Sequence, residues 1–446
     1  MRIQEREWRG QPHSPSLPEI HSSLPIPDTP NFLRKLIAFA GPGFLVAVGY
    51  MDPGNWATDL AAGSRYNYRL LFVIMLSNLM AILLQSLCIK LGIAGGRDLA
   101  QACRDHFSRP VTIVLWLFAE VGIAACDLAE VIGSAIALNL LFRIPLIIGV
   151  CITALDVLLI LFLENKGFRY IEAIVLVLTA TIGVCSGLEI IFARPEFASV
   201  VHGFLVPDSG LIHDPMMLYI AIGILGATVM PHNLYLHSAV VQTRDYERTH
   251  EGKREAMKYC NIDSVVALTF ALLVNAAILI VSAATFYRNG RHDIAEIQDA
   301  HKLLSPLLGA KLASGIFAIA LLASGQNSTL TGTLAGQIVM EGFVNLRLRP
   351  WLRRLVTRLI AIIPAVAVTA VAGESGTARL LILSQVVLSM QLSFAVFPLV
   401  MFTGDRLKMG EFVNPSWLKL LSWIVAITIA ALNIWLLLQF ARGWFS

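Results

Sequence analysis

Two short polar sequences interrupt apolar segments and carry side chains that could bind a cation. Residues 52–55 read Asp-Pro-Gly-Asn, and residues 230–233 read Met-Pro-His-Asn. They offer a carboxylate, an amide oxygen and a thioether, and unwound backbone around Gly49 and Ala227 would add carbonyl oxygens. Mg²⁺ and Ca²⁺ prefer oxygen ligands, whereas sulfur favours softer ions. The set from Asp52, Asn55 and Met230 therefore predicts a site for a divalent transition metal, with Mn²⁺ and Fe²⁺ expected and Cd²⁺ as a mimic.

The elements that must position these residues are interrupted membrane helices. About 15 apolar residues precede each polar sequence, which is about 22 Å of helix and too short for a hydrocarbon core of about 30 Å. Proline removes a backbone donor, and glycine tolerates unwound geometry. Backbone groups freed in a membrane need new partners, so such breaks persist inside protein or around a ligand. Two plain proline kinks are the alternative, which the matched positions of the two breaks disfavour.

Composition places the whole chain in a bilayer. Of the 446 residues, 56% are hydrophobic and 14% are charged, against about 25% charged in soluble proteins. Disordered, coiled-coil, collagen-like and disulfide-scaffold classes are excluded, and a net charge of +4 gives no reason to expect a nucleic-acid partner. Segments of helix length predict an all-α polytopic membrane protein with eleven spans: 36–64, 69–93, 111–141, 145–163, 168–193, 216–243, 262–287, 309–340, 355–373, 377–403 and 415–440.

The positions of the breaks predict the domain organisation. They fall in the first and sixth spans, and interrupted helices at matching places in two halves are typical of inverted-repeat transporters with a midplane site. The expected divisions are 35–193, 194–403 and a last span with the C-terminus at 404–446. Residues 1–34 are Pro-rich and are predicted to form a disordered tail. Most Lys and Arg residues fall on one side, which predicts a multi-pass cell-membrane protein with a cytoplasmic N-terminus.

Acidic residues in the third span form a candidate proton path. Glu120, Asp127 and Glu130 are spaced by seven and three residues and share one helical face. Buried carboxylates in membranes are costly and mark proton relays, although interhelical hydrogen bonding is the alternative. Arg353 and Arg354 open the ninth span and are expected to pair with Asp127 or Glu130, besides anchoring the helix on the inner side.

His232 follows the second break and titrates near neutral pH when unperturbed. It is therefore a candidate proton acceptor or gate residue more than a metal ligand. Metal arrival at Asp52 would favour the charged carboxylate and expel a proton toward Asp127 and Glu130. This reasoning predicts that metal binding and proton movement are coupled.

These motifs resemble the Nramp family (natural resistance-associated macrophage proteins). The resemblance rests on the sequences at 52–55 and 230–232, Asp-Leu-Ala-Glu at 127–130, and the glycine-rich stretch at 325–343, and it extends from about Lys35 onward. It implies a LeuT-like fold and proton-coupled uptake of Mn²⁺ and Fe²⁺, most like the bacterial manganese-uptake members. It also implies that the family's metal ligands map onto the following groups: Asp52, Asn55, Met230, the carbonyl of Ala227 and, in an occluded state, Gln385.

Two positions depart from the family pattern. Gly49 stands where the family has Ala, which changes little if its carbonyl is the contact. Asn327 stands where Ser is common. The related Mg²⁺ transporters lack the site methionine, so Met230 argues against that branch.

Three other functions fit this sequence less well than metal transport. An amino-acid symporter on the same fold is opposed by Asp52, whose charge would repel a substrate carboxylate. A membrane enzyme is opposed by the absence of HExxH and of a recognisable nucleophile motif. A channel is also less favoured, because broken helices in two repeats are more typical of alternating-access transporters. We therefore expect a secondary transporter without a resident cofactor, whose partners are divalent metal ions, protons and lipid, and which acts as a monomer.

Overall fold

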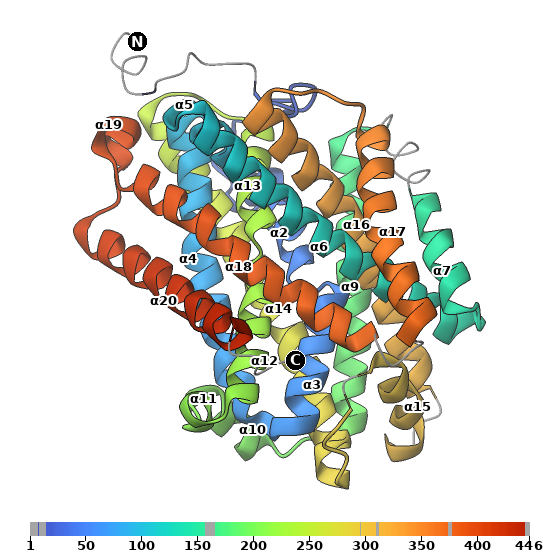
Figure 1. Cartoon of the computed structure of the whole chain (residues 1–446). Coiled ribbons are helices and arrows are strands. Elements are labelled where there is room, and N and C mark those ends of the chain that lie inside the picture. Colours follow the sequence, from blue (N-terminus) through green and yellow to red (C-terminus); the bar gives the residue numbers. More distant parts are fainter. Residues whose placement is uncertain are drawn as a thin grey trace.

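The computed structural model describes residue 8 and residues 15–156, 166–294, 296–308, 312–372 and 377–441, without the side chains of 350, 354, 368–372, 378, 440 and 441. In this part the chain is a bundle of long helices with one two-stranded sheet (Figure 1). Seven of the described helices are long and apolar enough to cross a membrane, or eight when the bent pair at 32–49 counts as one span. The predicted polytopic α-helical membrane protein is confirmed at this level.

The elements have the following bounds: β1 (Leu24–Pro25), α1 (Phe32–Phe39), α2 (Pro42–Gly49), α3 (Pro53–Tyr66), η2 (Asn67–Leu70), α4 (Leu71–Gly95), α5 (Leu99–His106), α6 (Arg109–Phe142), α7 (Leu146–Ile152), η3 (Thr153–Leu155), α9 (Phe168–Ala193), α10 (Phe197–Leu205), α11 (Gly210–His213), α12 (Pro215–Thr228), α13 (Pro231–Val240), η4 (Val241–Thr243), β2 (Arg244–Asp245), α14 (His250–Thr285), η5 (Tyr287–Asn289), α15 (Ile297–Leu308), α16 (Ala313–Val344), α17 (Pro350–Ala372), α18 (Thr377–Thr403), α19 (Arg406–Met409), η7 (Gly410–Phe412) and α20 (Ser416–Ala441).

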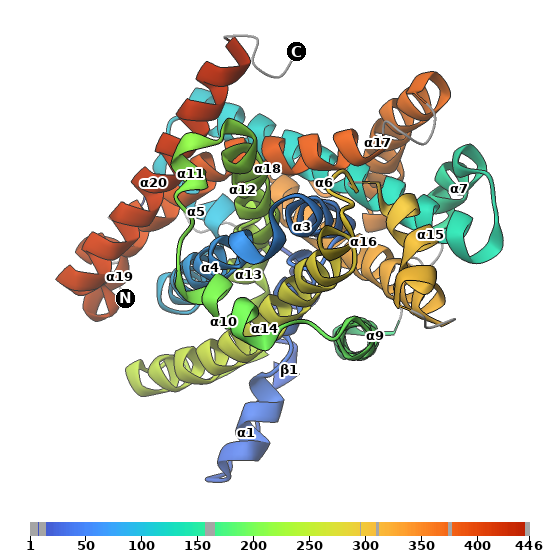
Figure 2. The same ribbon diagram turned by 90° about the horizontal axis from the view of Figure 1, so that it is seen from below.

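Both predicted breaks are present. α2 ends at Gly49 and α3 begins at Pro53, while α12 ends at Thr228 and α13 begins at Pro231. Each second half starts with proline at its first helical position, where the missing N–H costs nothing. Figure 2 shows α3 near the middle of the bundle, with α12, α14 and α16 around it. The two unwound turns therefore lie inside protein, as the hydrogen-bonding argument requires.

The helix bounds agree with most predicted spans and differ at two places. α14 begins at His250, twelve residues before the expected start of its span, and the first span is also bent by 48° between α1 and α2. The bend follows from Gly41, whose φ of +133° is open to glycine alone and where a side chain would meet Glu172. Part of the span predicted at 145–163 lies outside the described residues.

The described part of the N-terminal tail contacts the bundle. Its residues 15–25, called here the N-terminal strap, lie across one end of the bundle. β1 pairs in parallel with β2, which follows the second broken span. The strap needs no apolar core of its own, because carboxylates of the bundle bind it: Ser16 Oγ donates to Asp98 Oδ2 at 2.7 Å, and the Leu17 N–H donates to Glu341 Oε2 at 2.9 Å.

Glycines of α16 allow that helix to pack tightly against its neighbours. A side chain at Gly325 would collide with Ser134, one at Gly332 with Glu130, and one at Gly336 with the Arg353 guanidinium. Small residues permit this close approach between membrane helices. The glycine-rich stretch thus brings the acidic face of α6 and the basic start of α17 against α16.

Candidate functional site

The residues at the two breaks meet around one nitrogen atom. The amide Nδ2 of Asn55 lies 2.6 Å from Asp52 Oδ1, 3.0 Å from the Ala227 carbonyl oxygen and 3.4 Å from the Gly49 carbonyl oxygen. Asp52 and Asn55 are both buried. Asp52 also caps α3 by accepting the Asn55 backbone N–H at 2.9 Å. Four of the predicted metal-site residues, from the ends of the three helices α2, α3 and α12, therefore converge.

Two further predicted ligands, Met230 and Gln385, come from the start of α13 and from α18. Met230 precedes α13, is fully buried, and packs with Cys126 of α6 and Leu388 of α18. Gln385, also in α18, lies so close to Gly54 that any side chain at 54 would collide with its amide. Its Oε1 is buried and accepts no hydrogen bond within the described part of the chain. The side-chain oxygen of Gln385, one of the predicted ligands, thus lies near the first break and accepts no hydrogen bond from another described residue.

Two polar side chains hold the unwound turn of the first break, and sequence reasoning had not assigned them there. Asn275 of α14 donates from Nδ2 to the Tyr50 carbonyl at 2.7 Å, and Ser324 of α16 donates to the Met51 carbonyl at 2.5 Å. They satisfy carbonyls that a break in a membrane would otherwise leave bare. The one sequence signal for Asn275 is an amide in an apolar segment.

Asn233 lies beside the first break from the second one. Its amide is fully buried, and neither Oδ1 nor Nδ2 has a hydrogen-bond partner among the described residues. A side chain at Gly49 would collide with that amide. The glycine at 49 therefore leaves room for Asn233.

The acidic face of α6 meets Arg358 of α17, which the sequence analysis did not single out. Arg358 lies 3.7 Å from Glu130 Oε2, forms an ion pair with Asp156, and donates to the Asp127 carbonyl at 3.4 Å. All these groups are buried. Thr329 of α16 donates to Glu130 at 3.4 Å, which links the same group to the glycine-rich stretch.

The ion-pair prediction for Arg353 is corrected. Arg353 lies 3.0 Å from Glu120, which also accepts a hydrogen bond from Trp116 at 3.0 Å. Arg353 and Arg358 are five residues apart, about 7.5 Å along the helix. Arg358 therefore reaches the depth of Glu130, while Arg353 meets Glu120, which is closer to the start of α6. The side chain of Arg354 lies outside the described residues.

Two histidines of α13, His232 and His237, contact other buried polar groups. Buried His232 places Nε2 3.8 Å from Cys126 Sγ, and that sulfur lies 3.5 Å from Glu130 Oε1. His232 is thus linked through Cys126 to the acidic face of α6. His237 was missed: its Nδ1 lies 2.9 Å from Gln85 Oε1, and Gln85 donates to the Tyr50 hydroxyl at 2.9 Å.

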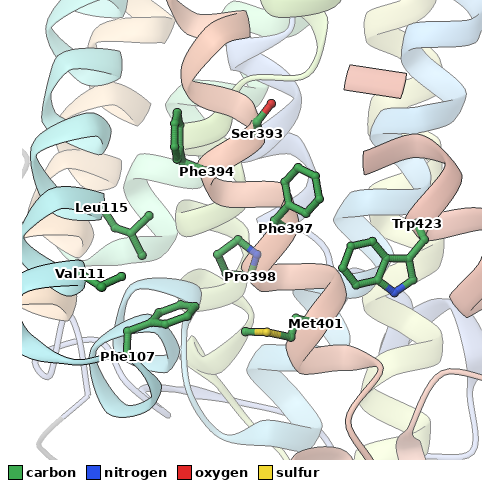
Figure 3. A pocket seen from close by; sticks show the side chains of 9 residues that line it. All are labelled: Phe107, Val111, Leu115, Ser393, Phe394, Phe397, Pro398, Met401 and Trp423. Atoms are coloured by element: carbon green, nitrogen blue, oxygen red, sulfur yellow. The ribbon is translucent and has the colours of Figure 1, made fainter. Parts of the chain in front are cut away.

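An apolar groove of about 330 Å³ lies elsewhere, between α6, α18 and α20 (Figure 3). Its lining contains Val111, Leu115, Phe397 and Trp423, with Ser393 the one polar side chain. It offers no charged ligand to a cation. The buried donors at the breaks remain the candidate site. No three His, Cys, Asp or Glu side chains gather as a metal cluster among the described residues, so this site depends on one carboxylate with amide, carbonyl and thioether groups.

Known proteins resemble this chain along most of its length. Residues 43–439 match the family model described as natural resistance-associated macrophage protein-like. The chain belongs to the Nramp family. An Nramp relative from Nostoc sp., a divalent metal cation transporter named MntH, is 65% identical over 96% of this chain and 97% of its own.

Solved structures place the Nramp fold beside other transporters. A mutant of the Eremococcus coleocola manganese transporter is 41% identical, with a TM-score of 0.90 over 97% of this chain and 92% of its own. Mhp1, a nucleobase-cation-symport-1 family transporter, is 15% identical with a TM-score of 0.59 over 89% of this chain and 91% of its own. The second likeness concerns the fold alone and extends the Nramp architecture beyond metal transporters.

Proposed function

We propose that this Nramp protein imports divalent transition metal ions, Mn²⁺ and Fe²⁺ with Cd²⁺ as a mimic, by proton-coupled alternating access. The observation that carries the proposal is the meeting of Asp52, Gly49 and Ala227 oxygens around Asn55 Nδ2. A group of oxygens within 2.6–3.4 Å of one donor offers a cation several ligands at once. Names of close relatives, which are divalent metal cation transporters, support the same substrate class.

Met230 supports transition metals over Mg²⁺ and Ca²⁺. Its thioether is fully buried at the start of α13, beside the break that also provides the Ala227 carbonyl. Hard cations bind oxygen far better than sulfur. The metal ion is the substrate here, and the protein needs no resident cofactor and catalyses no reaction.

The proton path starts from the same break. Asp52 would release its proton when the metal arrives, because a nearby cation favours the charged carboxylate. Three contacts lead from the second break to Arg358. His232 lies 3.8 Å from Cys126, Cys126 lies 3.5 Å from Glu130, and Glu130 lies 3.7 Å from Arg358. His232 and Glu130, with Asp127, would pass the proton on, and Glu120 with Arg353 would lie farther along α6.

The architecture proposed for this cycle keeps eleven spans in two inverted repeats, 35–193 and 194–403, with 404–446 as a last span. The N-terminus would be cytoplasmic in the cell membrane, because most basic residues lie on that side. Each repeat contributes one broken helix, which supports a shared midplane site. We propose that the protein works as a monomer in lipid, with metal ions and protons as its partners and no nucleic acid.

Uptake by proteoliposomes tests the function. Purified protein should accumulate Mn²⁺ and carry protons inward with it, which a pH-sensitive dye reports. Asp52→Ala should abolish both fluxes, while Asp299→Asn on exposed α15 should leave both unchanged. Asp127→Asn with Glu130→Gln should keep Mn²⁺ binding and lose proton flux. Amino-acid transport in place of Mn²⁺ transport would contradict the proposal and favour the organic-solute symporter.

A further inference from the structure

The apolar groove between α6, α18 and α20 opens on the outer surface of the bundle (Figure 3). Side chains on its three walls stay partly exposed: Val111 of α6 by 43%, Phe394 of α18 by 41% and Trp423 of α20 by 37%. All three helices are long and apolar enough to cross a membrane. In a bilayer these walls therefore face hydrocarbon rather than water.

The groove follows α18 for about three turns. Its lining on that helix extends from Ser393 to Met401, which is eight residues or about 12 Å. Phe394 stacks on Phe118 of α6 at 4.3 Å between ring centroids, so α6 and α18 touch at that end. Ser393 carries the one hydroxyl of the lining, and this hydroxyl accepts a hydrogen bond from Asn433 at 3.0 Å. Water would find few partners here, whereas a hydrocarbon chain would contact apolar side chains along the whole groove.

A lysine stands at the other end of the groove. Lys419 lies one helical turn before Trp423 on α20. Its Cε would be 3.0 Å from a side-chain carbon added at Gly404, which follows Met401 by three residues. Asp405, the acidic residue next to Gly404, is engaged by Lys408 in an ion pair. Among the described residues no carboxylate pairs with Lys419.

The lysine decides which lipid the groove would select. An apolar chain gains little by moving from the bilayer into the groove, because lipid tails are as apolar as these side chains. Basic residues between membrane helices on the cytoplasmic side bind anionic headgroups. Lys419 also lies in the first turn of α20, where the helix dipole favours a negative charge. The groove thus determines where a chain lies, and the charge determines which headgroup it carries.

We propose that this groove binds one acyl chain of an anionic phospholipid from the cytoplasmic leaflet, with Lys419 bound to the headgroup phosphate. The inference goes beyond metal transport and needs only that the chain crosses a membrane with the start of α20 on the cytoplasmic side. The lipid chain fills the space between α6, which carries the acidic face, and α18, which carries Gln385.

Quenching of Trp423 by brominated lipids tests the assignment, because bromine on an acyl chain quenches a tryptophan that it touches. The purified protein is reconstituted into phosphatidylcholine vesicles with increasing fractions of brominated phosphatidylglycerol or, in parallel, brominated phosphatidylcholine. Trp423→Phe supplies the signal of the other tryptophans, which is subtracted. Half-maximal quenching should need about fivefold less phosphatidylglycerol than phosphatidylcholine, as expected for one basic residue at a membrane surface.

Two pairs of variants separate the headgroup from the chain. Lys419→Gln should abolish the preference for phosphatidylglycerol, while Lys258→Gln, on the exposed side of α14 at the same membrane face, should keep it. Val111→Phe should raise the phosphatidylglycerol fraction at half-quenching about fivefold, because the larger side chain fills the groove. Val114→Phe is its control, since Val114 is 49% exposed on the same helix but does not line the groove.

Equal quenching by the two lipids, or a preference that survives Lys419→Gln, would overturn the headgroup assignment. Absence of quenching by either lipid would overturn the site, and a disulfide between two Trp423→Cys chains would then identify a second copy as the occupant. Lys419→Arg guards against misfolding, because it keeps the charge and should keep the preference. Metal uptake is not part of the readout, so a failure of the proposed function would leave this result unchanged.

Discussion

Gln385 of α18 lies directly against Gly54 of α3, in the space where any other residue at 54 would place its side chain. The first break and the tenth predicted span therefore touch without an intervening group. Gln385 Oε1 has no hydrogen-bond partner in the part of the chain that the structure describes, and the missing side chain of Gly54 leaves the space that the Gln385 amide occupies.

Gly54→Ala should reduce Mn²⁺ uptake at least tenfold, because the methyl group displaces the Gln385 amide from the site. Uptake by proteoliposomes at equal protein content measures it. Gly187→Ala in α9 is the matched control, since nothing lies within 4 Å of its added methyl group. That variant should transport normally and be slightly more stable, by about 0.5–1 kcal/mol. Normal uptake by Gly54→Ala would show that the position of Gln385 is unimportant.

Met230→Ala should weaken Cd²⁺ binding more than Mn²⁺ binding, because the softer ion depends more on the thioether. Competition by Ca²⁺ should rise at the same time. Calorimetry with the three ions measures the change. Met217→Ala provides the control, since Met217 is equally buried but lies in the first half of α12. Parallel losses for Cd²⁺ and Mn²⁺ would indicate that Met230 only fills space.

Arg358→Leu should destabilise the protein strongly, by about 3–5 kcal/mol, because it removes the buried cation that pairs with Asp156 and lies 3.7 Å from Glu130. Thermal unfolding in detergent measures the effect. Lys302→Leu removes a cation from the exposed pair with Asp299 and should change little. Adding Asp156→Asn to Arg358→Leu should recover part of the loss, and no recovery would mean that the two residues are not energetically coupled.

Asp98 predicts a pH dependence at the strap. It lies between α4 and α5, and burial raises its pKa from 3.8 to about 6, although Gln101 and Ser16 donate to it. The native state then binds more protons than the unfolded state between pH 4 and 6. The stability contributed by this group is therefore full below about pH 4 and is lost as pH rises through 6.

Asp98→Asn should remove this dependence. The variant should gain stability over the native protein on going from pH 4.5 to pH 7.5, by about 2–3 kcal/mol at most. Thermal shifts at the two pH values measure the difference. Asp245→Asn, on the exposed side of β2, controls for loss of a negative charge. A native-minus-variant difference that is the same at both pH values would rule out Asp98 as the source.

The sequence was most informative where residue type alone restricts the backbone. Proline and glycine beside polar residues located both breaks to within a residue or two, and the donors at 52, 55 and 227 do converge. Partners across helices were less predictable. Arg353 and Arg358 look alike in the sequence, and only the depth at which α17 packs on α6 decides which one meets Glu130.

Contacts made by single amides or by the tail could not be predicted for the same reason. Asn275 differs from any buried asparagine only through its distance to the Tyr50 carbonyl. The strap has the composition of a disordered chain, yet two carboxylates from distant segments bind its backbone and its serine.

The pairing of β1 with β2 has a mechanical consequence. β1 precedes the first broken helix, and β2 follows the second. Their pairing therefore links two elements that are more than 200 residues apart along the chain. Movement at this end of either broken helix is transmitted to the other through the sheet. Any opening on this side, as the proposed alternating access requires, would displace both helices together or first separate a sheet of two residues per strand.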